Sequence, residues 1–167
     1  RSSDLMKVTE SLKPVSIRKQ GDKHILDIGQ NMAGWLRIRI KGQAGDSIRL
    51  RFAERLQADG EIFTKNLRDA HCTDIYVVSG REPQDTTWAP RFVYHGFRYV
   101  EISGYPNAKT EDFTAEVVDD EMAHTGTFTC SDETLNQVLH NAFWGIRSNY
   151  KGMPVDCPQH NERQPWL

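Results

Sequence analysis

The stretch WLRIRIKGQAGDSIRLRF, residues 35–52, contains two segments in which apolar and charged side chains alternate strictly. Successive side chains of a β-strand point to opposite faces, so segments 36–40 and 47–52 each separate an apolar face from an arginine face. Each segment is therefore predicted to be a strand that is buried on one face and exposed on the other. Gly42 and Gly45 lie between them, and we predict a hairpin turn as the connection.

The same period of two extends outward over residues 14–119. Further strands are predicted at 25–28, 73–78, 87–93 and 97–103, with shorter ones at 117–118 and 127–129. Many short strands without an intervening helix favour an antiparallel β-sandwich, so the fold class is predicted to be mainly β. Residues 53–70 have no clear period, and we predict a long loop there with a helical turn.

The pattern changes after Cys130. Ser131 is the predicted N-cap of a helix, and the acidic residues 132 and 133 suit its first turn because of the helix dipole. Apolar residues then recur at helical spacing, at Leu135, Val138, Leu139, Ala142 and Ile146. One amphipathic helix of about 17 residues is predicted, and it must bury its apolar stripe on the sandwich or on helices outside this chain.

We divide the chain into three segments. Residues 1–13 are assigned to an N-terminal linker segment and residues 14–122 to the β-sandwich domain. Residues 123–167 contain the predicted helix and are assigned to the beginning of a second domain. The boundary lies near the acidic residues 119–121 and Gly126, which are typical of a polar hinge.

Composition limits the class of protein. The chain has 167 residues, of which 38% are hydrophobic, enough for one domain or one domain with part of a second. A formal net charge of −2 and the lack of a long apolar run argue against nucleic acid or a membrane as the main partner. Cys72, Cys130 and Cys157 form no zinc-binding pattern with the six histidines, so we expect free thiols and no metal. The compartment stays open between the cytoplasm and an exported location.

The sequence PVDCPQHNERQPWL, residues 154–167, holds the main candidates for chemistry. Neighbouring prolines and Trp166 would desolvate Glu162, which raises a carboxyl pKa and suits a general acid. Asp156 could accept a hydrogen bond from a substrate hydroxyl, while Arg163 and Trp166 offer a donor fork and a flat apolar face for a sugar ring. The alternative is a polar turn whose charges are simply solvated.

Other groups have both a functional and a structural interpretation. The strand arginines form either a positive stripe or an outer face paired with acids; they are Arg37, Arg39, Arg49 and Arg51. His95 either lines a sugar groove or is a structural histidine at a strand junction. The segment 27–31 is either a polar site or, because it contains Gly29, a turn held by local side-chain bonds.

Six segments in order resemble the bacterial α-L-rhamnosidases of glycoside hydrolase family 78. They are DIGQNMAGW (27–35), TKNLRDA (64–70), TDIYVVSG (73–80), PRFVYHGFRYVEISGYP (90–106), TGTFTCSDETLNQV (125–138) and PVDCPQHNERQPW (154–166). The resemblance implies that the β-sandwich precedes the catalytic domain. It also implies that residues 123–167 hold the first helix of an (α/α)6 barrel that is otherwise missing from this chain.

The resemblance also implies roles for the predicted site residues. Glu162 matches the general acid of an inverting hydrolase, Asp156 matches a carboxylate that holds rhamnose hydroxyls, and Arg163 and Trp166 match residues that shape the sugar pocket. No cofactor and no metal are implied. The sequence departs from the family pattern at His160, Asn161 and Pro165, where arginine, an acid and glycine are usual; at Asn161 a substrate-binding or pKa-tuning carboxylate is lost.

An inverting glycosidase also needs a second carboxylate about 6.5–9.5 Å from the first, to activate water. The resemblance places this general base beyond Leu167, so the parent protein is expected to be an α-L-rhamnosidase and this chain alone to be inactive. The expected partner is a terminal L-rhamnoside, and association of copies through the parent protein is left open. One alternative is a non-catalytic module that binds carbohydrate, through the solvent-exposed face of its strands or through the aromatic residues 94, 97 and 99. Another is a module that only braces the barrel.

Overall fold

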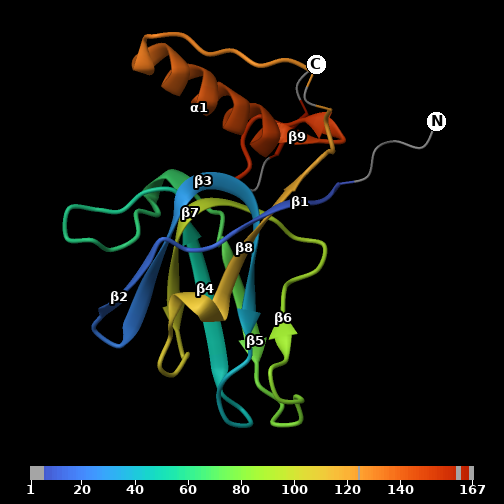
Figure 1. Ribbon diagram of the computed structural model, residues 1–167. Helices are drawn as coiled ribbons and strands as arrows, with labels where there is room; N and C mark the ends of the chain where they lie inside the picture. Colours follow the sequence, from blue (N-terminus) through green and yellow to red (C-terminus); the bar gives the residue numbers. More distant parts are fainter. Residues whose placement is uncertain (1–5, 124, 161–162, 166–167) are drawn as a thin grey trace.

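The computed structural model describes residues 6–123, 125–160 and 163–165 (Figure 1). Its strands are β1 (Lys7–Leu12), β2 (Ser16–Gln20), β3 (Lys23–Arg39), β4 (Ser47–Ala53), β5 (Thr73–Val77), β6 (Thr87–Trp88), β7 (His95–Ser103) and β8 (Phe113–Asp119). Helix α1 (Glu133–Asn149) follows, and then the short strands β9 (Tyr150–Lys151) and β10 (Met153–Pro154). The 3₁₀ turns are Lys65–Leu67 and Thr110–Asp112. The predicted mainly-β fold followed by a helix is thus confirmed.

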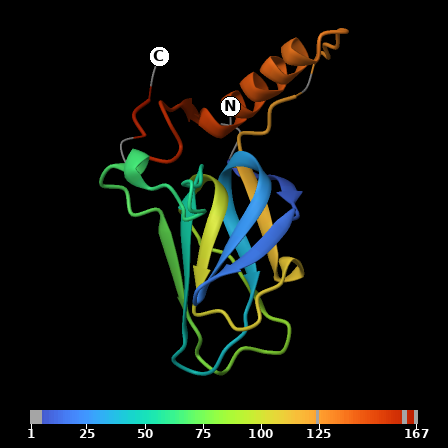
Figure 2. The same ribbon diagram turned by 90° about the vertical axis from the view of Figure 1, so that its left-hand side faces the viewer.

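Strands β1 to β8 form one strongly curled antiparallel sheet in the order β1-β8-β3-β7-β4-β5, with β2 and β6 also paired to β3. Strand β3 is 17 residues long, and its pairing with β7 shifts register between Asp27 and Met32. It pairs with β2 before this shift and with β6 and β8 after it. Figures 1 and 2 show the sheet curling around its own interior, with α1 across one end. The alternating strands therefore enclose one core.

The connection between β3 and β4 corrects one prediction. These strands are consecutive in the chain, but β7 lies between them and pairs with both, so the predicted hairpin is wrong. The turn pairs with the residue after β5 instead: Gly45 N donates to Val78 O at 2.8 Å, and Val78 N donates to Asp46 O at 2.9 Å. Alternation identifies a strand and its buried face, whereas the choice of partner depends on residues far away in the sequence.

Other boundaries differ from the predicted ones. The strand predicted at 87–93 is limited to β6, and the described residues 127–129 are not in a strand. Strand β1 lies within the segment assigned to a linker and pairs with β8, from Lys7 opposite Asp119 to Leu12 opposite Ala115. The loop at 53–70 contains the predicted helical turn, at Lys65–Leu67.

The core is built from the apolar faces predicted by alternation. Five side chains of β3 and β4 are at most 1% exposed; they are Leu36, Ile38, Ile48, Leu50 and Phe52. Residues of the paired strands β7 and β8 complete the same cluster, among them Phe97, Val100, Ile102 and Phe113. Burial of a side chain of this size typically contributes about 1.5–3 kcal/mol to stability. This cluster is therefore the main contribution to the stability of the fold.

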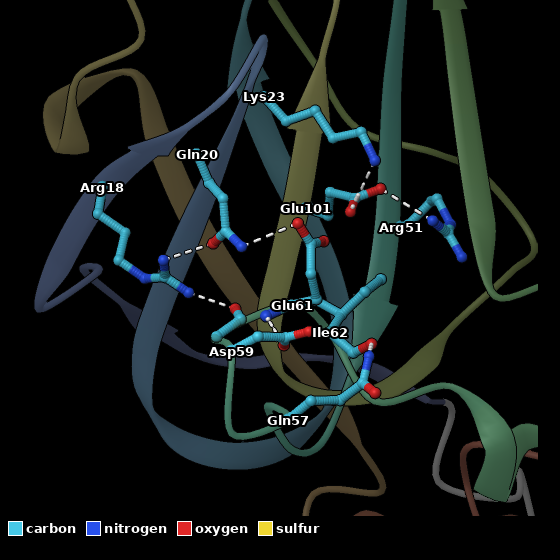
Figure 3. A network of polar contacts seen from close by, with 10 residues as sticks. Arg18, Gln20, Lys23, Arg51, Gln57, Asp59, Glu61, Ile62 and Glu101 are labelled. Atoms are coloured by element: carbon cyan, nitrogen blue, oxygen red, sulfur yellow. Dashed lines mark hydrogen bonds and ion pairs between the residues drawn. The ribbon is translucent and has the colours of Figure 1, made fainter.

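The outer face of the sheet is lined with paired charges. Arg37 Nε lies 2.7 Å from Glu116 Oε1, Arg39 Nη1 lies 2.7 Å from Asp85 Oδ1, and Arg51 Nη1 lies 2.9 Å from Glu101 Oε1. Figure 3 shows Glu101 between the side chains of Arg51 and Lys23, while Gln20 of β2 reaches Glu61 in the loop after β4. The arginines on β3 and β4 are thus mostly paired with acids, which confirms the structural interpretation.

His95 and the segment 27–31 are also structural. His95 is buried, its Nε2 lies 3.0 Å from Asp74 Oδ1, and its ring stacks on Phe52 with centroids 4.3 Å apart. Gly29 has a φ of 84°, and its N–H donates to Asp27 Oδ1 at 2.7 Å, as expected for a turn held by a local side chain. Both positions therefore support the strands rather than forming a site.

Helix α1 has the predicted length of 17 residues but begins one residue later than predicted. Asp132, not Ser131, is the N-cap, and its carboxylate accepts hydrogen bonds from Thr134 N at 2.8 Å and Leu135 N at 3.2 Å. The apolar stripe is not buried by the described part of the sandwich, since Leu135, Val138, Leu139 and Ile146 are 45–58% exposed. Trp144 is the half-buried side chain of α1 that packs against the core cluster.

Candidate functional site

The segment that follows α1 forms a closed loop. Val155 bridges Pro165 in antiparallel fashion, and Asp156 N donates to Gln164 O at 3.1 Å. Residues 156–164 are called the motif loop below. Glu162 and Trp166 lie outside the described residues, as does Asn161, so the roles predicted for them stay predictions.

The structure describes the other two predicted site residues. Asp156 is exposed, and its Oδ1 accepts a hydrogen bond from Cys157 N at 2.9 Å. Arg163 is half-buried with a φ of 44°, and its guanidinium lies 4.0 Å from the centroid of the Tyr94 ring. Arg163 Nη2 also donates to Tyr94 O. Asp156 and Arg163 thus lie near the bridge that closes the motif loop, and the sandwich already holds part of the arginine.

The motif loop rests directly on the sandwich. Pro158 is buried against Gly96 of β7, so closely that a Cβ at Gly96 would lie 2.8 Å from Pro158 Cγ. Cys72 Sγ donates to Gln159 O at 3.1 Å. His160 Nε2 donates to Asn66 O, with 2.5 Å between the two atoms. Figure 2 shows this segment, in red, above the green 3₁₀ turn that contains Asn66.

Glu54 links two segments that are far apart in the sequence, one of which contains Asn66, the residue that His160 contacts. The carboxylate of Glu54 accepts a hydrogen bond from Asn31 Nδ2 at 3.0 Å and one from Asn66 Nδ2 at 3.4 Å. Arg98 makes a bidentate ion pair with Asp27: Nε donates to Oδ1 at 2.9 Å and Nη2 donates to Oδ2 at 3.0 Å. Burial acts to raise the pKa of Asp27, but the hydrogen bonds from Arg98 and from the Gly29 N–H outweigh it and hold this pKa below the usual value.

A basic junction lies between α1, β8 and the motif loop. Lys151 Nζ donates to Arg147 O at 3.0 Å and to Val118 O, and it lies 5.5 Å from the centroid of the Tyr94 ring. Burial lowers the pKa of Lys151 to about 8, although the nearby carboxylates oppose this effect. The same burial raises the pKa of Tyr94. Two cations thus contact one tyrosine ring beside the motif loop.

A hollow of about 1280 Å³ borders Arg163 and Tyr94. Trp35, Trp88 and the fully exposed Phe92 also line it. The aromatic residues named as an alternative sugar-binding surface do not form one, because Phe97 is fully buried and Tyr99 packs beside a small satellite cluster. Among the described residues no group of three or more His, Cys, Asp or Glu could hold a metal ion. No helix in the described ranges is long and apolar enough to cross a bilayer.

The model of the bacterial α-L-rhamnosidase concanavalin-like domain matches residues 17–119, which is more than half of the chain. The chain belongs to the bacterial α-L-rhamnosidase family. The model of the bacterial α-L-rhamnosidase 6 hairpin glycosidase domain matches residues 123–167 directly after it.

Individual rhamnosidases show the same likeness. An α-L-rhamnosidase of Formosa agariphila is 39% identical over 158 residues, covering 93% of this chain and 17% of the relative. The structure of α-L-rhamnosidase from Dictyoglumus thermophilum aligns with a TM-score of 0.92 and 38% identity, over 97% of this chain and 18% of that one. The Streptomyces avermitilis α-L-rhamnosidase complexed with L-rhamnose aligns with a TM-score of 0.91 and 38% identity, over 96% and 16%. The chain thus spans less than a fifth of the length of these rhamnosidases.

Sequence reasoning alone missed the sandwich residues that touch the motif loop of this rhamnosidase-family chain. Asn66, Tyr94 and Gly96 fall within segments that carry the family resemblance, and that was the signal available. For Cys72 the sequence predicts only a free thiol, which the structure confirms, and the residue is 9% exposed. Most of these contacts involve a backbone atom, either of the loop or of the sandwich residue itself. No complementary pair of side chains therefore identifies these residues in the sequence.

Proposed function

We propose that this chain contributes the β-sandwich and the beginning of the catalytic domain to an α-L-rhamnosidase. The observation that carries the proposal is the consecutive match of two rhamnosidase domain models, at 17–119 and 123–167. The proposed division is a sandwich domain that extends to residue 122 and includes β1, followed by a catalytic portion 123–167. The exposed apolar stripe of α1 supports this division, because further barrel helices would bury it.

The proposed reaction is hydrolysis of terminal α-L-rhamnosides with inversion. Glu162 is proposed to protonate the glycosidic oxygen, Asp156 to bind rhamnose hydroxyls, and Arg163 and Trp166 to shape the sugar pocket. The exposed carboxylate of Asp156 supports its part of the proposal, because a substrate could reach it. The general base would come from residues beyond this chain, so the 167-residue chain alone should have no turnover.

The departure at His160 is compatible with this proposal. The family pattern has arginine at this position, and both side chains carry N–H donors. His160 Nε2 already meets Asn66 O, so a donor is retained where the pattern has one. The loss of an acid at Asn161 is expected to change efficiency or sugar preference rather than to remove the reaction.

The test uses the full-length protein and its Glu162→Gln variant. Nitrophenolate leaves readily without a proton, whereas a sugar alkoxide does not, so an acid variant should lose far more activity on a rhamnosyl disaccharide than on p-nitrophenyl α-L-rhamnoside. General acid catalysis typically contributes about 10²–10⁴-fold, which sets the expected loss on the disaccharide. Equal losses on the two substrates would remove Glu162 from this role. No turnover of either substrate by the wild type would refute the rhamnosidase proposal itself.

A further inference from the structure

We propose that the sandwich is a positioning element for catalysis: Asn66, Cys72, Tyr94 and Gly96, called the seat below, fix the motif loop in its reactive placement. This inference rests on the proposed function of the loop. It assigns a catalytic consequence to residues of the β-sandwich, which lie outside the predicted sugar site.

The seat holds the loop on both sides of the proposed acid. His160 is the last described residue before Glu162, and it is bound to Asn66 O. Arg163 directly follows Glu162, and it is bound to Tyr94 through both its Nη2 and its guanidinium face. The loop ends are closed upon each other by the bridge between Val155 and Pro165. Anchors on both sides restrict where the residue between them can be placed, and catalytic groups require placement to within about 0.5 Å.

The seat is attached to buried parts of the sandwich. Gly96 lies in β7, which pairs with β3 and β4 in the middle of the sheet. Cys72 O accepts a hydrogen bond from Phe52 N at 2.9 Å, and Phe52 is 1% exposed. Asn66 is held from below by Glu54, and the next residue, Leu67, is 3% exposed. The loop is therefore held by residues that are joined directly to the buried core, where local opening is rarest.

Gly96 gives the most direct test of this arrangement. The three atoms nearest to a Cβ at this position all belong to the loop: Pro158 Cγ at 2.8 Å, Gln159 N at 3.1 Å and Gln159 Cβ at 3.2 Å. The φ of Gly96 lies outside the left-handed region, so alanine is compatible with the strand backbone. A single methyl group would thus act as a wedge between the sandwich and the motif loop.

The first experiment measures kcat and KM of full-length Gly96→Ala on p-nitrophenyl α-L-rhamnoside and on a rhamnosyl disaccharide. A misplacement of about 1 Å can cost about 100-fold in rate, so kcat on the disaccharide should fall by 10- to 100-fold. The loss on the aryl glycoside should be smaller, because that substrate needs the acid less. Unfolding midpoints are measured in parallel. An unchanged kcat on the disaccharide, or equal losses on both substrates, would overturn the proposal.

Matched pairs keep the proposal testable if the wedge prevents folding. Cys72→Ala removes the donor to Gln159 O whereas Cys72→Ser retains one, and Tyr94→Leu removes the ring under Arg163 whereas Tyr94→Phe retains it. His160→Leu and His160→Arg form the same kind of pair at Asn66 O. Each first member should lose about fivefold or more of kcat on the disaccharide, the equivalent of one typical hydrogen bond or cation–π contact, and each second member should recover it. Equal activities within every pair would refute a positioning role.

The outcome also separates this inference from the proposed function. If Glu162→Gln shows the substrate-dependent loss and the seat variants do not, the function stands and the seat is only structural. If Glu162→Gln shows equal losses on both substrates, the proposed acid itself is wrong. If both sets show the same dependence on the leaving group, the seat acts through the acid.

Discussion

Replacing Arg147 by methionine is expected to detach α1 from the sandwich. The guanidinium of Arg147 contacts three side chains of β1 and β8: Nε lies 2.8 Å from Asp119 Oδ2, Nη1 lies 2.7 Å from Glu10 Oε2, and Nη2 lies 3.0 Å from Thr9 Oγ1. It also stacks on Trp144 with 4.5 Å to the ring centroid. Because the apolar stripe of α1 is exposed, these polar contacts and the packing of Trp144 against the core hold the helix on the sandwich.

The magnitude follows from burial. The Arg147 side chain is 11% exposed and that of Asp119 is 4% exposed, so methionine would leave a buried carboxylate without its main partner. Breaking such a pair typically costs about 3–5 kcal/mol. The bond to Glu10, which is 42% exposed, adds at most about 1 kcal/mol. Lys151 partly compensates the charge of Asp119, which favours the lower end, about 3 kcal/mol.

Amide hydrogen exchange of the protein measures this effect locally. A loss of about 3 kcal/mol should speed exchange in α1 by roughly 10²-fold while β7 stays protected. Exposed Arg49→Met is the control and should change stability by no more than about 0.5 kcal/mol. Adding Asp119→Asn to Arg147→Met should restore part of the protection, since the buried carboxylate that lost its partner is then neutral. Unchanged exchange in α1, or a further loss in the double variant, would refute this reasoning.

Three further predictions concern pH. The pKa of Asp27 is lowered on folding, so the ionised carboxylate stabilises the folded state. This stabilisation is complete above the unfolded pKa of about 4 and is lost as the pH falls below that value. Arg98→Met should therefore weaken the acid dependence of urea unfolding. The pKa of Lys151 falls to about 8 on folding, so the unfolded chain binds more protons between about pH 8 and 10; stability should rise across that window, and Lys151→Met should remove the rise. A backbone N–H and the Tyr76 hydroxyl lower the pKa of Glu82 to about 2, and Tyr76→Phe should raise it in an NMR titration of the carboxyl group.

The sequence was sufficient for the central strands and for their buried faces, but not for β1 and β2, which no predicted strand covers. Alternation in 36–40 and 47–52 reflects local burial, and the apolar faces of both segments lie in the core as predicted. It could not give the order of the strands, because the insertion of β7 between β3 and β4 is decided by residues about 50 positions away. Nor could it choose between Ser131 and Asp132 as the cap, since both side chains are good acceptors and the backbone conformation decides.

The motif loop could be predicted from sequence, whereas its support could not. Residues 154–167 stand out by the density of polar and aromatic side chains, but each hydrogen bond that their described part makes with the sandwich involves a main-chain carbonyl: those of Asn66 and Tyr94 in the sandwich, and that of Gln159 in the loop. Every residue has a backbone carbonyl, whatever its side chain. The type of residue therefore does not indicate which positions of the sandwich the loop will contact. Gly96 differs from these positions because its residue type matters. Only a residue without a side chain lets Pro158 of the loop approach the strand so closely.

Main-chain acceptors also explain how the loop can change while its placement is kept. The Asn66 carbonyl can be met by any side chain that presents an N–H donor at the right reach, which histidine does here and arginine can also do. Substitution at position 160 is then constrained by donor geometry rather than by identity. The position of Gly96 allows no such freedom, because any added side chain occupies space already filled by Pro158 and Gln159. A positioning role therefore predicts that position 160 accepts any side chain with a suitably placed donor, whereas position 96 accepts only glycine.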